Sequence, residues 1–68
     1  MNSPPRREWT PDLVGQLRYA LDMTQGQFAE ELGVSKHQVC DWEYDRTVVS
    51  KTGARLLDYV AALVGFKG

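Results

Sequence analysis

The sequence has few residues that could form disulfides or bind metals, and it has no long apolar run. A single cysteine, Cys40, excludes an intramolecular disulfide, and with only one histidine, His37, no credible set of metal ligands remains. No apolar run approaches the ~20 residues of a membrane span. Residues 1–8 also lack the apolar stretch of a signal peptide. We therefore expect a cytoplasmic protein without a membrane partner.

The residue patterns of an enzyme are missing as well. The sequence shows no nucleophile with a neighbouring base and no phosphate-binding glycine loop, and 68 residues are too few for a closed pocket. We expect neither catalysis nor a cofactor. A basic surplus is also absent: the formal net charge of −1 counts against a nucleic-acid partner, because domains that bind nucleic acids are usually basic. The placement of the charges has to decide that question.

The length of 68 residues allows one domain with one small core, because chains of this size bury only about 60% of their unfolded surface. An apolar share of 43% with 25% charged residues is ordinary for a soluble globular protein. Residues 1–8, with two prolines, are interpreted as a flexible arm and residues 9–68 as the domain. Arg6 and Arg7 belong either to a solvated tail or to a basic arm that touches DNA.

The most informative stretch runs from residue 23 to residue 44 and predicts two short helices in succession. Thr24 with Gln27 matches a capping box, and Ser35 with Gln38 matches a second one. Gly33 suits the left-handed residue that ends a helix. Hydrophobic staples are expected between Met23 and Phe28 and between Val34 and Val39. We predict helices at about 25–32 and 36–44, joined as a helix-turn-helix.

Two further helices flank this unit. The first begins with Thr10 as N-cap and Pro11 at the first helical position, and its apolar residues recur at helical spacing: Leu13, Leu17, Ala20 and Leu21. Trp9 is expected to pack back as a lid. The last helix is capped by Ser50 or Thr52 and has one apolar face formed by Leu56, Leu57, Val60, Ala61 and Val64.

The last helix also carries a second apolar stripe, formed by Tyr59, Ala62, Leu63 and Phe66. A four-helix monomer needs only one such face, and exposed apolar stripes commonly mark self-association. We expect a homodimer through this stripe. The alternative is that Tyr59 and Phe66 fold over Trp9 and the first helix of the same chain.

The helix at 36–44 can be oriented from its own pattern. Val39 and Trp42 are its large apolar residues and must face inward. The opposite side then presents Lys36, His37, Cys40, Asp41 and Tyr44. Asp45 follows where the helix must stop, because Asp tolerates the left-handed conformation better than most residues. Arg18 lies at the edge of the buried stripe of the first helix and requires a carboxylate partner.

These residues resemble the Cro- and phage-repressor-type helix-turn-helix family, also called the xenobiotic-response-element type. The resemblance is carried by Leu17-Arg18, Met23-Thr24-Gln25, Phe28-Ala29, Leu32-Gly33-Val34-Ser35, Val39 and Trp42-Glu43. It implies an all-α bundle of four to five short helices that binds DNA as a dimer, with an ion pair between Arg18 and Glu43. The sequence departs from the family at Asp45, where glycine is usual, and at Val49, where proline is common. Its loop is also less basic.

The resemblance implies that the start of the helix at 36–44 enters the major groove. We expect Lys36, His37, Cys40 and Asp41 to face base edges, with Lys36 directed to guanine and Asp41 accepting from cytosine N4. Asp41 is otherwise a surface acid at the edge of the groove. Phosphate contacts are expected from Thr24, Gln25, Gln38, Tyr44, Arg46 and Lys51, with Gln25 matching a backbone-contacting glutamine of the family.

Two functions of different classes follow. The first is a sequence-specific transcriptional regulator, most simply a repressor, that binds double-stranded DNA as a homodimer and associates with the nucleoid when bound. The alternative is a protein-interaction module or antitoxin-like component that uses the same helical face on a protein partner, which the near-neutral charge favours.

Overall fold

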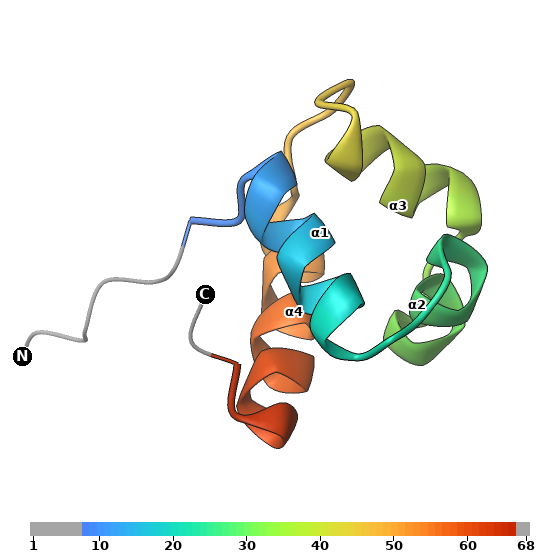
Figure 1. Ribbon diagram of the computed structural model, residues 1–68. Helices are drawn as coiled ribbons and strands as arrows, with labels where there is room; N and C mark the ends of the chain where they lie inside the picture. Colours follow the sequence, from blue (N-terminus) through green and yellow to red (C-terminus); the bar gives the residue numbers. More distant parts are fainter. Residues whose placement is uncertain (1–7, 67–68) are drawn as a thin grey trace, which may run out of the picture.

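The computed structural model describes residues 8–66, which form four α-helices joined by short loops (Figure 1). They are α1 (Pro11–Ala20), α2 (Gln25–Leu32), α3 (Lys36–Glu43) and α4 (Lys51–Val64). No strand occurs within residues 8–66, so the predicted all-α class is confirmed. None of these helices is long and apolar enough to cross a bilayer. Arg6 and Arg7 of the expected arm lie outside the described residues.

Each helix begins at a hydroxyl residue whose side-chain oxygen accepts a backbone N–H from three residues further on. The four N-caps are Thr10, Thr24, Ser35 and Ser50, so Ser50 rather than Thr52 opens α4. The box at Thr24 is complete, because its N–H also donates to Gln27 Oε1 at 2.9 Å. At Ser35 the structure shows the hydroxyl half of the box, with Gln38 N–H at 3.1 Å from Ser35 Oγ.

The turns after α2 and α3 use the left-handed backbone conformation that the sequence indicated. Gly33 ends α2 at φ 79°. Asp45 follows α3 at φ 59°, and α3 ends at Glu43, one residue earlier than predicted. Asp22 also has a positive φ, 57°, in the turn between α1 and α2, which the sequence pattern did not indicate. Short polar side chains tolerate this conformation, so no glycine is needed at either aspartate.

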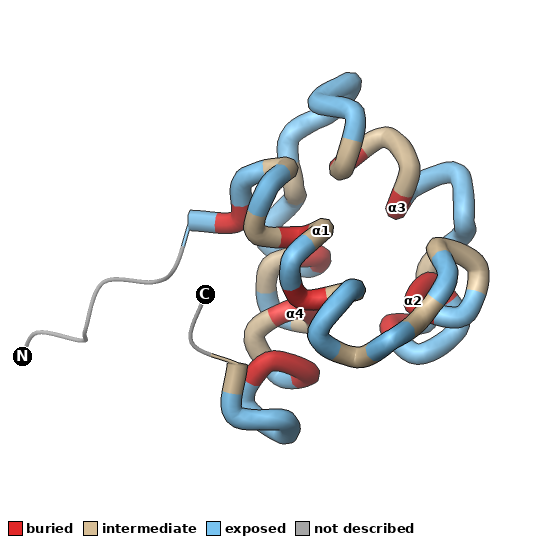
Figure 2. The backbone as a smooth tube through the Cα atoms, viewed as in Figure 1, coloured by how far each residue is buried: buried red, intermediate tan, exposed pale blue. Residues whose placement is uncertain are grey.

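The core lies where the inner sides of the four helices meet (Figure 2). α3 packs against α1 and α2, and α2 also packs against α4. The buried side chains are Trp9, Val14, Leu17, Phe28, Ala29, Leu32, Val39, Trp42, Leu57, Val60 and Ala61. Ala20 and Val64 were expected to face this core but are exposed. Each is the last residue of its helix.

Trp9 closes the core as predicted and is only 6% exposed. Its indole Nε1 donates to Asp58 Oδ1 of α4 at 2.8 Å, and its ring stacks on Phe66 with centroids 6.2 Å apart. These contacts join the segment before α1 to the segment after α4. Phe66 therefore packs within its own chain, which is the arrangement that the sequence left as the alternative. Tyr59 does not pack over Trp9 in this way, because its side chain is 66% exposed.

The first turn of α4 approaches Trp42 of α3 very closely, and the contact depends on a glycine. Gly53 is buried, and a Cβ atom built on it would lie 2.8 Å from Trp42 Cζ2. Only a residue without a side chain allows the backbone of α4 to pass over this ring. The contact fixes where the loop at 44–50 ends relative to α3.

Candidate nucleic-acid interface

The helix-turn-helix unit consists of α2, the turn at 33–35 and α3. Val39 and Trp42 are fully buried, so they set the inner side of α3 as predicted. Lys36, His37 and Gln38 are exposed in its first turn. α3 therefore presents a polar N-terminal end to solvent while its apolar side anchors it, which is the arrangement that a helix needs in order to enter a groove.

Arg18 and Glu43 form the ion pair that the resemblance implied. Arg18 Nε lies 2.7 Å from Glu43 Oε2 and Nη2 lies 3.0 Å from Oε1, so the pair is bidentate. Arg18 Nη1 also donates to the carbonyl of Met23 at 3.1 Å. The hydrogen bonds to Glu43 raise the pKa of Arg18, although partial burial opposes this. The pair joins α1 to the end of α3 and neutralises one carboxylate of the helix.

Gln25 of α2 and Cys40 of α3 contact each other within the chain. The Gln25 amide donates to Glu43 Oε1 at 3.3 Å, and its Oε1 accepts from Cys40 Sγ at 2.9 Å. Both side chains thus lie between α2 and α3, where they extend the Arg18–Glu43 pair. These bonds engage the Gln25 amide and the Cys40 thiol within the chain; a phosphate contact by Gln25 and a base contact by Cys40 stay predictions. At the start of α2 the capping box uses the backbone N–H groups of Thr24 and Gln27, which leaves those of Gln25 and Gly26 for an anion.

Asp41 lies between two basic side chains on the outer part of α3. Its Oδ2 is 3.4 Å from His37 Nε2, and its Oδ1 is 3.5 Å from Arg46 Nη1. The Asp41 side chain is only 17% exposed, whereas that of His37 is 83% exposed. Asp41 was expected to accept from cytosine, but both of its oxygens already face cationic or potentially cationic groups. Asp41 therefore differs from Lys36 and His37 of the predicted base-reading set, whose side chains are exposed.

Arg46 belongs to the loop after α3, but its side chain lies against the helix because the turn reverses the chain. Its backbone N–H donates to the carbonyl of Asp41 at 2.9 Å, and Asp45 N–H donates to that of Trp42 at 3.4 Å. With Asp45 in the left-handed conformation, this is a Schellman motif. The guanidinium lies 5.3 Å from the centroid of the Tyr44 ring. Arg46 and Tyr44 therefore extend the polar surface of α3 toward its C-terminal end.

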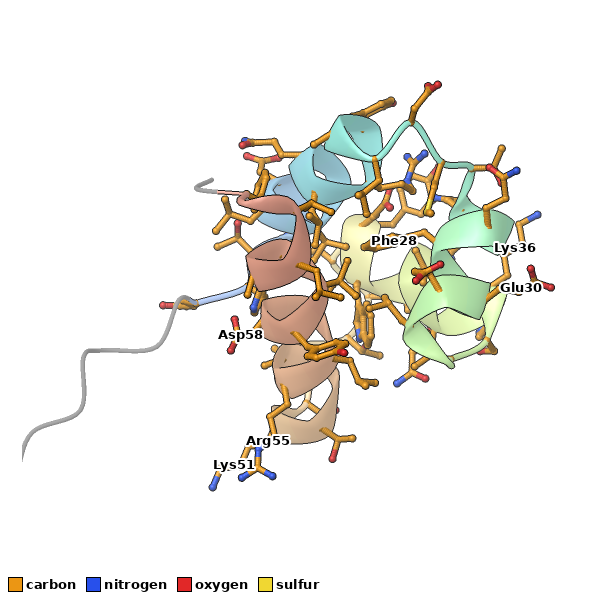
Figure 3. All side chains as sticks on the ribbon, turned by 90° about the horizontal axis from the view of Figure 1, so that it is seen from below. Phe28, Glu30, Lys36, Lys51, Arg55 and Asp58 are labelled. Carbon is orange, nitrogen blue, oxygen red and sulfur yellow. The ribbon has the colours of Figure 1, made fainter. Side chains whose placement is uncertain are left out.

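The other expected phosphate contacts are exposed but spread widely. Thr24 uses its hydroxyl oxygen to accept Gln27 N–H and can still donate its own O–H. Lys36 projects from one side of the molecule, while Lys51 and Arg55 project together from the start of α4 at the opposite end (Figure 3). A surface that used all of these cations would have to run along α3 and across the loop at 44–50.

Two features of this surface had little or no usable sequence signal. Nothing in the spacing predicted that Gln25 bridges Cys40 and Glu43, since the bonds depend on how α2 crosses α3. The fold-back of Arg46 could have been anticipated only in part, from the position of Asp45 close to the end of the helix. Within residues 8–66, no group of three or more His, Cys, Asp or Glu side chains is placed to hold a metal ion.

Comparison with models of known protein families found no match, and a search of curated proteins also found none. The geometry of the chain's own residues therefore has to support any assignment of function.

Proposed function

We propose that this protein is a sequence-specific DNA-binding transcriptional regulator that acts in the cytoplasm as a homodimer, with α3 inserted in the major groove. The observation that carries the proposal is the arrangement of α3 itself. Val39 and Trp42 bury one side of it, a left-handed Gly33 turn sets it against α2, and its first turn exposes Lys36 and His37. Repression is the simplest role for a small domain that only occupies DNA.

The roles on this surface divide between base edges and phosphates. Lys36 and His37 are the proposed base-reading residues, because they occupy the first turn of α3 and are exposed. The proposed phosphate contacts are Thr24, Gln38, Tyr44, Arg46, Lys51 and the backbone at the start of α2. The apolar side chains of α4 that remain exposed are proposed to form the dimer contact: Tyr59, Ala62, Leu63 and Val64.

The test is selection of bound sequences from a random pool of DNA duplexes at physiological salt. An enriched site with two-fold symmetry is expected, and the separate Lys36→Ala and His37→Ala variants should weaken binding and relax the preference at one position in each half-site. Gln16→Ala is a suitable control, because Gln16 is exposed on α1 and does not belong to the helix-turn-helix unit. No enrichment by the parent protein would contradict the proposal.

A protein-interaction module or antitoxin-like component is the second candidate. It is favoured by the net charge of −1 and by the partial neutralisation of Arg46 by Asp41, which leaves few unpaired cations for phosphates. This alternative predicts no enriched DNA site, together with a partner whose binding is lost in the Lys36→Ala and His37→Ala variants. The same two substitutions therefore distinguish the candidates when DNA and protein binding are measured side by side.

A further inference from the structure

We propose that Asp41 is a positioning residue, which holds Arg46 on the face of α3 ready for a DNA phosphate, and that it does not read a base. The inference rests on the proposed function, because a positioned arginine has this use only if the face meets DNA. It assigns Asp41 a different role from the cytosine contact that its place on the helix suggested.

The first step is the position of the Arg46 backbone. Schellman bonds run from Arg46 N–H to the Asp41 carbonyl and from Asp45 N–H to the Trp42 carbonyl. They fix the backbone of the second and third residues after the helix. The Arg46 side chain therefore starts beside the last turn of α3 and not at the tip of the loop. A long side chain anchored there can reach the outer face of the helix.

The second step is the hold on the guanidinium. Asp41 Oδ1 lies 3.5 Å from Arg46 Nη1, and the Tyr44 ring lies beneath the same group, 5.3 Å from centroid to Cζ. Arg46 is still 60% exposed, so the remaining N–H groups can reach an incoming phosphate. Holding the guanidinium before DNA arrives lowers the entropy that is lost on binding.

The third step concerns the Asp41 carboxylate. Its two oxygens face His37 and Arg46, and only 17% of the side chain is exposed. Each oxygen could accept a further hydrogen bond, but little of the Asp41 side chain is open to a cytosine amino group. The phosphates that line a groove would also repel the carboxylate. The carboxylate is therefore better placed to orient the two basic side chains than to contact a base.

The experiment is a double-mutant cycle on the affinity of the full chain for its selected duplex. The dissociation constant is measured at several salt concentrations for the parent, Asp41→Asn, Arg46→Ala and the double variant. Arg46→Ala should lower the slope of log affinity against log salt by about one for each subunit. Asp41→Asn should tighten binding in the Arg46→Ala background, because there it removes a repulsive charge and has no arginine to release, while its effect on His37 is the same in both backgrounds.

In the parent background Asp41→Asn also frees the Arg46 side chain, so the gain in affinity should be smaller there or become a loss. The coupling between the two sites should be about two- to fivefold in affinity, the range that an exposed ion pair supplies. Asp45→Asn is the matched control, because it removes the neighbouring charge, tolerates the left-handed conformation and should be additive with Arg46→Ala. Thermal melting establishes that the variants are folded.

Three results would overturn the inference. Additive effects of Asp41→Asn and Arg46→Ala would show that Asp41 does not position Arg46. A changed base preference at one site position on Asp41→Asn in both backgrounds would show that Asp41 reads a base. Failure of the parent protein to select any duplex would remove the proposed function and this inference together, whereas the first two results remove the inference alone.

Discussion

Arg18 Nε lies 2.7 Å from Glu43 Oε2, and this bond ties the first helix to the end of the helix proposed to enter DNA. The two side chains are only 13% and 10% exposed, so water competes weakly for either partner. Glu43 also accepts from the Gln25 amide, which brings α2 into the same contact. A single carboxylate therefore joins α3 to both α1 and α2.

Replacing that carboxylate should be severely destabilising. Glu43→Ala leaves the Arg18 guanidinium largely buried and without its partner, which typically costs about 3–5 kcal/mol. A domain of this size has a free energy of unfolding of roughly 5 kcal/mol, so most of its stability should be lost. Urea unfolding followed by circular dichroism measures the change. Glu30→Ala, an exposed glutamate on α2, is the control, and equal midpoints for the two variants would contradict the prediction.

The stabilisation from this pair should persist into alkaline solution. The pKa of Arg18 is raised in the folded protein, so its contribution is complete below the ordinary pKa of arginine and is lost only above it. We expect the difference in unfolding free energy between the parent and Glu43→Gln to be the same at about pH 7 and about pH 10. A difference that shrinks over this range would show that another group carries the effect.

Gly53→Ala should destabilise the protein although alanine is the better helix former. The added Cβ would lie 2.8 Å from Trp42 Cζ2, and since both groups are buried, α4 would have to shift. Overpacking of this kind costs about 1–3 kcal/mol. Gly15→Ala in α1 is the matched control, because no atom lies within 4 Å of its added Cβ. That variant should gain about 0.5–1 kcal/mol, and a gain in both would contradict the close approach.

The sequence predicted those parts of the fold that depend on neighbours along the chain. Hydroxyl residues opened all four helices, and Val39 with Trp42 oriented α3, because caps and helical spacing act over a few residues. Contacts between helices were predicted less well. Two examples are the contact of Gly53 with Trp42 and that of Gln25 with Cys40. Both depend on how the helices cross, and the spacing of residues within one helix does not predict a crossing. The Arg18–Glu43 pair was anticipated through the family resemblance.

Trp9→Phe should lower stability by about 1 kcal/mol while keeping the fold. Phenylalanine can still fill much of the buried site, but Asp58 loses the indole N–H that donates to it at 2.8 Å. Thermal unfolding of the parent, Trp9→Phe and Asp58→Asn measures this. Asp58→Asn retains an acceptor oxygen and should cost less, so a larger loss for Asp58→Asn than for Trp9→Phe would contradict this role of the hydrogen bond.

Leu63→Glu should abolish the expected homodimer without unfolding the monomer. Leu63 is 65% exposed on α4, beside the similarly exposed Tyr59, so a charge there is tolerated in the monomer but not in an apolar contact between subunits. Sedimentation velocity at several concentrations should show a dimer for the parent and a monomer for the variant. Val48→Glu, at a loop valine that is 87% exposed, should remain dimeric.

Phe66→Ala separates the two roles that the sequence left open for the apolar stripe. Because Phe66 stacks on Trp9 in the same chain, its loss should lower the melting temperature and leave the dimerisation constant nearly unchanged. Leu63→Glu should weaken dimerisation and leave the melting temperature of the monomer nearly unchanged, since the Leu63 side chain has little contact to lose within the monomer. If Phe66→Ala weakens the dimer as strongly as Leu63→Glu does, then the interface includes the end of the chain as well as α4. A parent protein that is monomeric at all concentrations would remove the dimer from the proposal.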